Sequence, residues 1–220
     1  MAVLLDVDGT LIDSNDAHAH AWVDAGRETG HGVAYDYVRW LVGMGGDRVL
    51  PALTGLDAES AAGRRVLECR GEIFRRDYLP KLRAFPDARR LIERLLEHGH
   101  TLVVATSASE QDMNALLEQA GLDDLLQYQT SSDDADESKP APDIVDAALQ
   151  QVGARASGSM MIGDTPYDVA AARNAGVPIV GLLCGGWTRF NLAGAREIHD
   201  DPTDVLQNFE RSMLSAPVRY

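Results

Sequence analysis

The later part of this chain alternates short apolar segments with segments of helical periodicity. Residues 101–106 and 159–162 are apolar runs of strand length, and each is followed, after a turn, by about ten residues with an apolar stripe. Such runs are typical of strands buried on both faces, and strand–helix alternation joins parallel strands by right-handed crossovers. We therefore expect an α/β fold with a doubly wound parallel sheet, whose sites lie at the carboxyl ends of its strands.

The first apolar run ends in two acidic residues. Residues 3–13 read VLLDVDGTLID, so Asp6 and Asp8 leave the end of a predicted strand, and Gly9 allows a close turn after them. Carboxylates at a buried strand end are unfavourable unless a cation, hydrogen bonds or a shared proton compensates them. The pair predicts a cation site or an acid/base pair, with a solvated turn as the alternative.

Between this strand and the alternating part lies a region without strong strand signals. Residues 15–80 are rich in Ala, Arg, Asp and Gly and predict a helical insertion, which leaves residues 1–14 and 81–220 as the core. Residues 43–48 form a glycine-dense loop that lacks the Gly-Lys-Ser/Thr ending of a nucleotide-binding P-loop. The remaining expected strands are residues 128–130 and 177–183, and the expected helices are residues 16–29, 35–42, 57–78, 86–98, 109–120, 143–152, 167–174 and 202–214.

Composition excludes several classes of protein. A formal net charge of -14 disfavours a nucleic-acid partner, because the phosphate backbone would be repelled. No apolar run approaches the roughly 20 residues of a membrane span, and we expect no signal peptide before a strand that starts at residue 3. Cys69 and Cys184 are far apart and predict neither a disulfide framework nor a zinc site, so a reducing cytoplasm is the expected compartment.

Polar residues follow the later strands as well. Thr106 ends one predicted strand, and Asp164 follows another. Lys139 stands before a predicted helix and is, with Lys81, one of two lysines among 20 basic residues. Phosphoryl transfer to a carboxylate needs a nucleophile, a cation, donors for the phosphoryl oxygens and a proton for the leaving oxygen. Strand-end carboxylates, a hydroxyl and a lysine supply a candidate for each.

The segment from Asp6 to Thr10, DVDGT, resembles the motif that opens the haloacid dehalogenase-like (HAD) phosphohydrolases. The resemblance continues at Thr106, at Lys139 within SKPAPD, and at residues 163–168, GDTPYD. It implies a Rossmann-like core, with Asp6 as the phosphoryl-accepting nucleophile. The other implied roles are a general acid/base for Asp8, phosphoryl binding for Thr106, the Ser107 N–H and Lys139, and a Mg2+ site formed by Asp6, the Asp8 carbonyl and Asp164, with Asp168 acting through water or through the ligands.

The helical insertion resembles the small cap that covers the active site in this superfamily. His18 and Trp22 form a His-x-x-Ala-Trp pattern that is similar to the cap hinge of beta-phosphoglucomutase-like members. Arg48, at the end of the glycine-dense loop, is the expected cap contact to substrate. A surface position for His18 and Arg48, and a core position for Trp22, are the alternatives, while Lys81 and the acidic loop at residues 133–137 have no predicted role.

These features together predict a Mg2+-dependent phosphatase that acts on a small phosphorylated metabolite, either a phosphosugar or a phosphoglycolate-like acid, through a phospho-Asp6 intermediate. A phosphomutase of the beta-phosphoglucomutase type shares the core and is the first alternative. A phospho-accepting signalling module, also a doubly wound sheet with clustered Asp residues, is the second. A monomer or a homodimer is expected.

Overall fold

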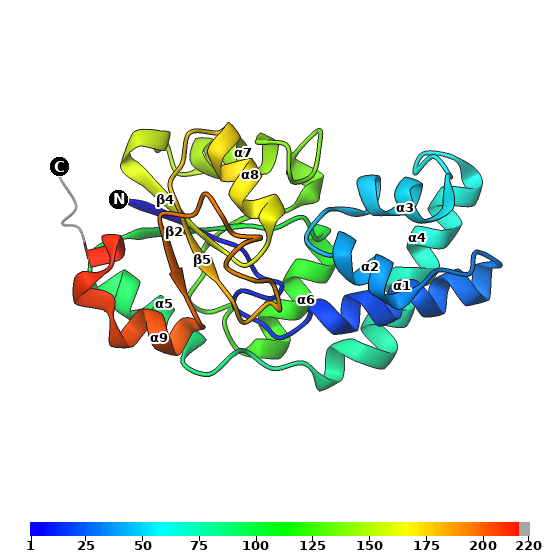
Figure 1. The fold of residues 1–220 in the computed structure, drawn as a ribbon, viewed down its shortest axis with the longest axis horizontal. Coiled ribbons are helices and arrows are strands. Elements are labelled where there is room, and N and C mark those ends of the chain that lie inside the picture. Colours follow the sequence, from blue (N-terminus) through cyan, green and yellow to red (C-terminus); the bar gives the residue numbers. More distant parts are fainter. Residues whose placement is uncertain (216–220) are drawn as a thin grey trace.

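The computed structural model describes residues 1–215 and is built around one parallel sheet of six strands (Figure 1). The strands lie in the order β3-β2-β1-β4-β5-β6, so the first strand of the chain is near the centre. They are β1 Ala2–Leu5, β2 Thr101–Ala105, β3 Tyr128–Thr130, β4 Ser159–Gly163, β5 Ile179–Leu182 and β6 Glu197–His199. The expected doubly wound α/β sheet is confirmed.

Helices cover both faces of the sheet. Val3 and Leu5 of β1 pack with α5 and α6, whereas Leu4 between them packs with α7 and α8 on the other face. All three side chains are fully buried, which is why the strand reads as an unbroken apolar run. The helices of this part are α5 Ala88–Glu97, α6 Glu110–Ala120, α7 Asp143–Gln151, α8 Pro166–Asn174 and α9 Pro202–Gln207.

The register of the central strands brings their carboxyl ends to one edge. Leu5 of β1 lies opposite Val104 of β2 and Ile162 of β4. The N–H of Asp6 continues this ladder with a hydrogen bond of 3.0 Å to the Ile162 carbonyl. The polar residues that follow β1, β2 and β4 therefore meet at the same edge of the sheet.

A helical segment lies beyond that edge, at the end of the sheet opposite the N-terminus (Figure 1). It consists of α1 Asn15–Thr29, α2 Tyr35–Leu41, α3 Gly46–Thr54, α4 Ala61–Ile73 and a π-helical turn at Phe74–Tyr78. Trp22, Val38, Leu50 and Val66 belong to an apolar cluster of its own, distinct from the two clusters that flank the sheet. No helix within residues 1–215 is long and apolar enough to cross a membrane.

Two helices of this segment differ from the sequence expectation. The loop expected at residues 43–48 is shorter, because α3 begins at Gly46 despite two glycines at its start and Pro51 inside it. Burial of Val49 and Leu50 outweighs the low helix propensity of those residues. The helix expected at residues 57–78 begins only at Ala61, where the Ser60 hydroxyl accepts a hydrogen bond of 2.9 Å from the Gly63 N–H.

The C-terminal part also differs. Strand β6 was not expected, because its three half-buried residues include Glu197 and His199 and form no apolar run. The helix expected at residues 202–214 ends at Gln207 and continues as two short 3-10 turns. The strand expected at residues 177–183 is confined to β5, Ile179–Leu182.

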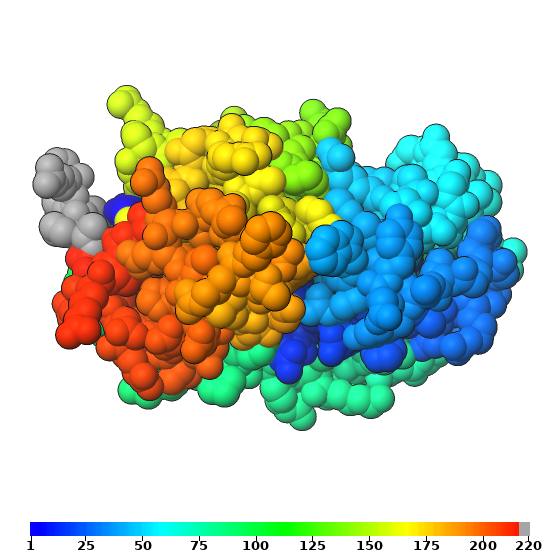
Figure 2. Space-filling model, in the orientation of Figure 1, coloured from blue at the N-terminus to red at the C-terminus, as the bar shows by residue number. Residues whose placement is uncertain are grey.

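Glycines allow the helical segment to approach the loops of the sheet. A Cβ on Gly43 would lie 2.7 Å from Thr165 Cγ2, and one on Gly45 would lie 2.6 Å from Ser138 Cβ. The N–H of Gly45 donates a hydrogen bond of 3.0 Å to the Ser138 hydroxyl. Figure 2 shows the segment around residue 40 lying directly against the core. The glycine-dense stretch is thus a site of backbone contact between the two parts of the molecule.

Candidate active site

Asp6 lies where the central strand ends, and both of its carboxylate oxygens accept hydrogen bonds. Lys139 Nζ donates to Oδ1 at 2.5 Å, and the Thr10 hydroxyl donates to Oδ2 at 3.1 Å. Lys139 is fully buried and also forms an ion pair of 2.7 Å with Asp168 Oδ1. Because the lysine is buried between two carboxylates, its side chain cannot turn toward solvent, and its positive charge stays beside Asp6.

Asp164 follows β4 and lies beside the same residues. Its Oδ1 lies 3.0 Å from the Thr10 hydroxyl, whose single hydrogen it shares with Asp6, and its Oδ2 accepts a hydrogen bond of 2.9 Å from Asn15 Nδ2. Gly9 and Gly185 leave the space it occupies, since a Cβ on Gly185 would lie 1.7 Å from Asp164 Oδ2 and one on Gly9 2.4 Å. The turn after β1, with Gly9 at φ +74°, is therefore built around this carboxylate.

The carboxylates of Asp6, Asp164 and Asp168 form a buried group in which one oxygen of each lies within 4.8 Å of the others. Lys139 supplies one positive charge against three carboxylates. Burial and the neighbouring Asp168 raise the pKa of Asp6 to about 7 against the opposing effect of Lys139. Burial and the nearby Asp168 and Asp6 likewise raise the pKa of Asp164 well above its usual value. Oxygen-only donors with uncompensated negative charge fit a hard divalent cation such as Mg2+.

Thr106 and Ser107 follow the neighbouring strand β2 and lie in the wall of the same cavity. The Thr106 side chain is buried, and its hydroxyl accepts a hydrogen bond of 3.1 Å from the Ala108 N–H. The Ser107 hydroxyl is buried and has no hydrogen-bond partner among the described residues. An unsatisfied buried hydroxyl at this edge is suited to bind an oxyanion beside Asp6.

Asp8 does not join the three-carboxylate group and faces the helical segment. Its Oδ1 accepts a hydrogen bond of 2.5 Å from the Ser14 hydroxyl and lies 2.6 Å from His18 Nε2. Burial alone would raise the pKa of Asp8, but the facing His18, Ser14 and nearby Arg70 outweigh burial and lower it. Asp6 and Asp8, two residues apart, are thus driven toward opposite protonation states.

His18 is buried in α1 and connects Asp8 to the end of α4. Its ring stacks on Phe74 with a centroid separation of 4.1 Å, and Arg70 donates to its Nδ1. Because a guanidinium can only donate, Nδ1 is the acceptor and Nε2 carries the hydrogen that Asp8 accepts. The alternative of a surface histidine is therefore wrong.

Arg70 and Arg75 bind one carboxylate of the core. Asp112 in α6 is buried, and it lies 2.8 Å from Arg70 Nη1 and 2.6 Å from Arg75 Nη1. No motif in the sequence singles out these three residues, because the arginines lie 42 and 37 positions before Asp112. The Arg75 side chain runs back over Gly71, where a Cβ would lie 3.0 Å from its Nη1, and this brings its guanidinium to the side on which Arg70 lies.

A cavity of about 560 Å³ lies between the helical segment and the sheet. Its wall includes Asp6, Asp8, Thr106 and Ser107 from the core. The helical segment contributes apolar side chains, among them Trp22, Met44 and Leu67, and as many polar or charged ones, among them His18, Glu68 and Arg70. The Asp6 and Asp8 carboxylates and the Thr106 and Ser107 hydroxyls therefore line one cavity, as expected of an active site.

Comparison with known proteins shows the family to which the chain belongs. The family model described as "Haloacid dehalogenase-like hydrolase" matches residues 3–182 of this chain. The chain belongs to the haloacid dehalogenase-like hydrolases. The expected membership in this superfamily is confirmed, and so is the expectation that the chain is an enzyme.

Relatives within the family extend over nearly all of the chain. The phosphoglycolate phosphatase of Rhodospirillum rubrum is 32% identical and covers 91% of this chain and 87% of its own length. The probable phosphatase IndB of Dickeya dadantii is 27% identical and covers 99% and 98%. The crystal structure of a hydrolase from Pseudomonas syringae has a TM-score of 0.89 at 29% identity and covers 96% and 98%. These similarities place the chain in the phosphatase branch of the HAD hydrolases.

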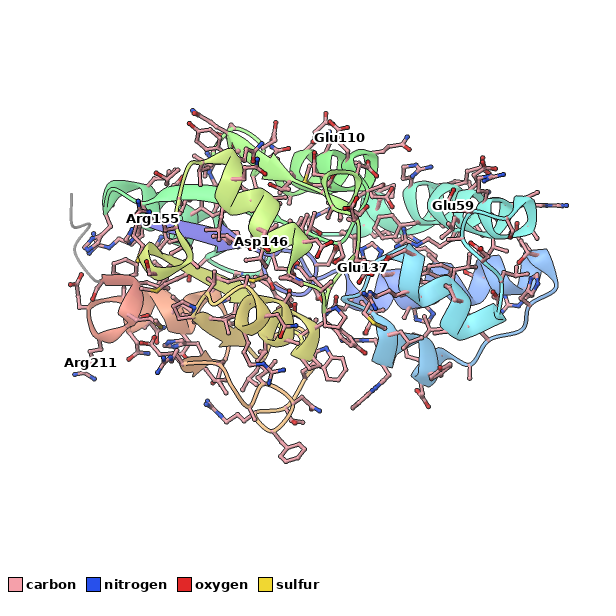
Figure 3. The ribbon with its side chains drawn as sticks, turned by 90° about the horizontal axis from the view of Figure 1, so that it is seen from above. Glu59, Glu110, Glu137, Asp146, Arg155 and Arg211 are labelled. Atoms are coloured by element: carbon pink, nitrogen blue, oxygen red, sulfur yellow. The ribbon has the colours of Figure 1, made fainter. Side chains whose placement is uncertain are left out.

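One predicted residue lies elsewhere in this HAD hydrolase. Arg48 is not in the wall of the cavity; its Nε donates to the Ser138 carbonyl at 3.1 Å, and its Nη2 lies 2.6 Å from Glu137 Oε2. Figure 3 shows Glu137 at the junction between core and helical segment. Arg48 therefore fastens the helical segment to the acidic loop, which gives that loop a structural contact, whereas Lys81 lies over the ring of Tyr78 at 5.8 Å.

Two further residues shape the site without having been predicted. Thr10 is part of the opening motif and bonds both Asp6 and Asp164, so its place in the motif was the available signal. Asn15 has no motif around it, yet its amide joins Asp164 to the Gly185 carbonyl at 3.0 Å. Only the fold could identify Asn15, because its two partners are about 150 or more residues away in the sequence.

Proposed function

We propose that this chain is a Mg2+-dependent phosphatase that hydrolyses a small phosphoric monoester through an aspartyl-phosphate on Asp6. The observation that carries the proposal is the position of Asp6, which lies at the end of the central strand, paired with buried Lys139 and open to the cavity. Residues 15–80 are proposed to act as the cap over this cavity and to exclude water from it. Two free cysteines support a reducing cytoplasm as its compartment.

The residues can divide the reaction into two steps. In the first, an oxygen of Asp6 attacks phosphorus while the bond to the leaving oxygen breaks. Asp8, whose pKa is low in the free protein, would bind a proton when the phosphate dianion arrives beside it, and it gives that proton to the leaving oxygen. Lys139, Thr106 and the Ser107 N–H and hydroxyl stabilise the charge on the transferring group. In the second step Asp8 takes a proton from water, the water attacks phosphorus, and inorganic phosphate leaves with Asp6 restored.

Mg2+ would be held by Asp6 and Asp164, with Asp168 beside them and the Asp8 carbonyl as the further ligand expected from the sequence. When bound, the ion supplies positive charge that offsets the repulsion between the Asp6 carboxylate and a phosphate dianion. The raised pKa values of Asp6 and Asp164 support this proposal, because a cation would favour the ionised form that a nucleophile requires.

The test is phosphate release from a panel of phosphomonoesters, with Mg2+ and with a chelator, together with labelling by a substrate carrying radioactive phosphate. We expect Mg2+-dependent release and acid-quenched label on Asp6. Asp6→Asn should lose more than about a thousandfold in turnover and all label. The matched control is Asp13→Asn, which removes an exposed carboxylate from the same turn. Turnover retained in Asp6→Asn would disprove the proposal.

The same experiment separates phosphatase from phosphomutase. Release of inorganic phosphate without any bisphosphate activator excludes a phosphomutase. If activity requires such an activator and yields an isomeric phosphosugar, the chain is a phosphomutase and the proposed phosphatase function is wrong. Membership in a hydrolase family already argues against the signalling module. The name of one relative, phosphoglycolate phosphatase, supports a phosphoglycolate-like substrate. The sequence also allowed a phosphosugar.

A further inference from the structure

The wall of the cavity beside Asp6 has more carboxylates than cationic side chains. This excess of negative charge constrains the leaving group of the substrate. Its wall contains eight carboxylates, those of Asp6, Asp8, Asp47, Glu59, Glu68, Asp112, Asp133 and Asp136. Only two arginines, Arg70 and Arg75, accompany them in the wall. Asp6 and Asp8 have chemical duties in the proposed reaction, so the question concerns the other six.

Both arginines of the wall are already committed. Asp112 binds both, at 2.8 Å and 2.6 Å, and Arg70 also donates to His18 and lies 5.0 Å from the Phe74 ring centroid. Together with Asp112 they leave one net positive charge. Arg48, the cation that the sequence suggested for this role, is turned to Glu137 outside the wall.

Three of the remaining carboxylates are exposed and lack a cationic partner, although Asp133 accepts a hydrogen bond of 3.0 Å from the Glu110 N–H. Asp47 lies 4.0 Å from Arg48 Nε. Glu68 projects from α4, whereas Asp133 and Asp136 lie on the loop between β3 and α7. None of the three has an ion-pair partner among residues 1–215. Glu59 has only Arg64 at 3.7 Å, and Figure 3 shows Glu59 far out on the helical segment. The entrance to the cavity is therefore negative from both the cap side and the core side.

We infer that the leaving group of the substrate carries no negative charge and is a polyhydroxylated or amine-bearing group, such as a sugar or an amino sugar. This rests on the proposed phosphatase function and narrows it. The phosphate end is provided for by Lys139, the free Ser107 hydroxyl and the carboxylate group that fits a cation. A second anion at the other end would meet Glu68, Asp133 and Asp136 without a free cation, whereas an ammonium group would gain from them. The apolar faces of Trp22, Met44 and Leu67 suit the ring of a sugar.

The test compares three pyranose 1-phosphates that share ring and phosphate position: glucosamine 1-phosphate, glucose 1-phosphate and glucuronic acid 1-phosphate. We expect kcat/KM, or the inhibition constant against p-nitrophenyl phosphate where turnover is slow, to favour the amine or the neutral sugar over the acid by about tenfold or more. The preference should weaken at high salt, because exposed charges are screened. The inference is overturned if glucuronic acid 1-phosphate is used or bound as well as glucose 1-phosphate or better. It is also overturned if all three compounds give equal values, including the case in which none of them inhibits.

Variants locate the effect. Glu68→Gln and Asp136→Asn should each reduce the ratio of amine to acid by about two- to fivefold, since each removes one exposed charge of the wall. Glu118→Gln is the matched control, because it removes one exposed charge from the outer face of α6 and should leave the ratio unchanged. If Glu118→Gln changes the ratio as much as the wall variants do, the net charge of the molecule and not the cavity is responsible, and the inference fails.

The outcome also distinguishes this inference from the proposed function. Hydrolysis of p-nitrophenyl phosphate that depends on Mg2+ and Asp6, combined with a preference for the acid, would remove the inference and keep the phosphatase. Absence of any phosphate release from p-nitrophenyl phosphate would remove the phosphatase itself.

Discussion

At the residue scale, two carboxylates separated by one residue are given different environments. Asp6 is buried beside Asp168, which raises its pKa to about 7, while Asp8 faces His18 and Ser14, which lower its pKa despite burial. Pairs of titratable groups driven apart in this way are typical of acid/base machinery in which each group has its own role. The turn that begins at Val7, whose carbonyl accepts hydrogen bonds from the N–H groups of Leu11 and Ile12, separates the two side chains.

Asp8→Asn tests the acid role. We expect hydrolysis of an alkyl phosphate to fall by about 10²- to 10⁴-fold, because the leaving alkoxide then receives no proton. p-Nitrophenyl phosphate, whose leaving group is stable as an anion, should lose much less in the transfer step, as measured by the rate of the p-nitrophenol burst. Equal losses for both substrates would show that Asp8 does not protonate the leaving oxygen.

The buried Asp6 carboxylate should make stability depend on pH. With its pKa raised to about 7 in the folded protein and near 3.8 in the unfolded chain, the folded state binds more protons between these values. Stability contributed at this site therefore falls as pH rises toward 7, by an amount on the order of 1 kcal/mol per pH unit.

Urea unfolding from pH 5 to 8 in a chelator measures this effect. The free energy of unfolding of Asp6→Asn relative to the natural protein should increase with pH and level off above about 7. Asp13→Asn, an exposed position, should show a constant difference. A difference for Asp6→Asn that does not change with pH would show that the carboxylate is ionised throughout.

At the element scale, the end of α4 decides how the helical segment, the proposed cap, is held to the core. Arg70 lies in the last turns of α4 and Arg75 in the π-helical turn that follows, five residues later. On a regular α-helix such residues point about 140° apart. The long Arg75 side chain covers that angle by running back over Gly71, where a Cβ would lie 3.0 Å from its Nη1. Asp112 of α6 can therefore bind both and holds the cap helix, His18 and Asp8 in one connected network.

Asp112→Asn should loosen this connection. Two arginines would lose their carboxylate, and we expect the free energy of unfolding to fall by about 2 to 4 kcal/mol, since both arginines keep some contact with water. KM should rise as well, because the cap would spend less time closed. Glu118→Gln on the same helix is the control for both measurements. If the free energy of unfolding and KM are both unchanged, the contact of Asp112 with the two arginines contributes neither to stability nor to substrate binding.

At the scale of the whole molecule, the site gathers negative charge that folding alone does not neutralise. Within residues 1–215, Asp164 has hydrogen-bond donors but no cationic side chain paired with it, and an oxygen of each of two further carboxylates lies within 4.8 Å. A divalent cation that binds only the folded protein must raise its stability, by about 2.7 kcal/mol at a concentration one hundred times its Kd. Mg2+ should therefore raise Tm in the absence of substrate.

Asp164→Asn provides the matched variant for that measurement. It removes a repelled carboxylate, so we expect a Tm in chelator equal to or above that of the natural protein, together with loss of the Mg2+-induced rise. Scanning calorimetry with and without Mg2+ reads both quantities. A full Mg2+ response in Asp164→Asn would show that the cation binds elsewhere.

The sequence by itself determined the sheet and the candidates for chemistry. Unbroken apolar strands specify a sheet buried on both faces, and helix stops such as Gly30 and Gly121 mark element ends because their left-handed conformation suits glycine. Asp6, Thr106 and Asp164 could be named because strand ends of a parallel sheet share one edge, and Lys139 because it is one of two lysines and lies in a segment that resembles a family motif. The structure brings the four residues together. These signals are local in the chain, so they are readable without tertiary structure.

Only the tertiary structure decided which side chains face the cavity and which fasten the cap. Arg48 was expected at the substrate and instead pairs with Glu137, while Arg70, Arg75 and Asp112 were not expected to meet. The physical reason is that an arginine carries the same charge on any face of a helix, and its partner is set by helix rotation and by contacts with segments far away in sequence. The two carboxylates after the first strand were apparent at once, but their separate protonation states follow from burial and neighbours that exist only in the folded molecule.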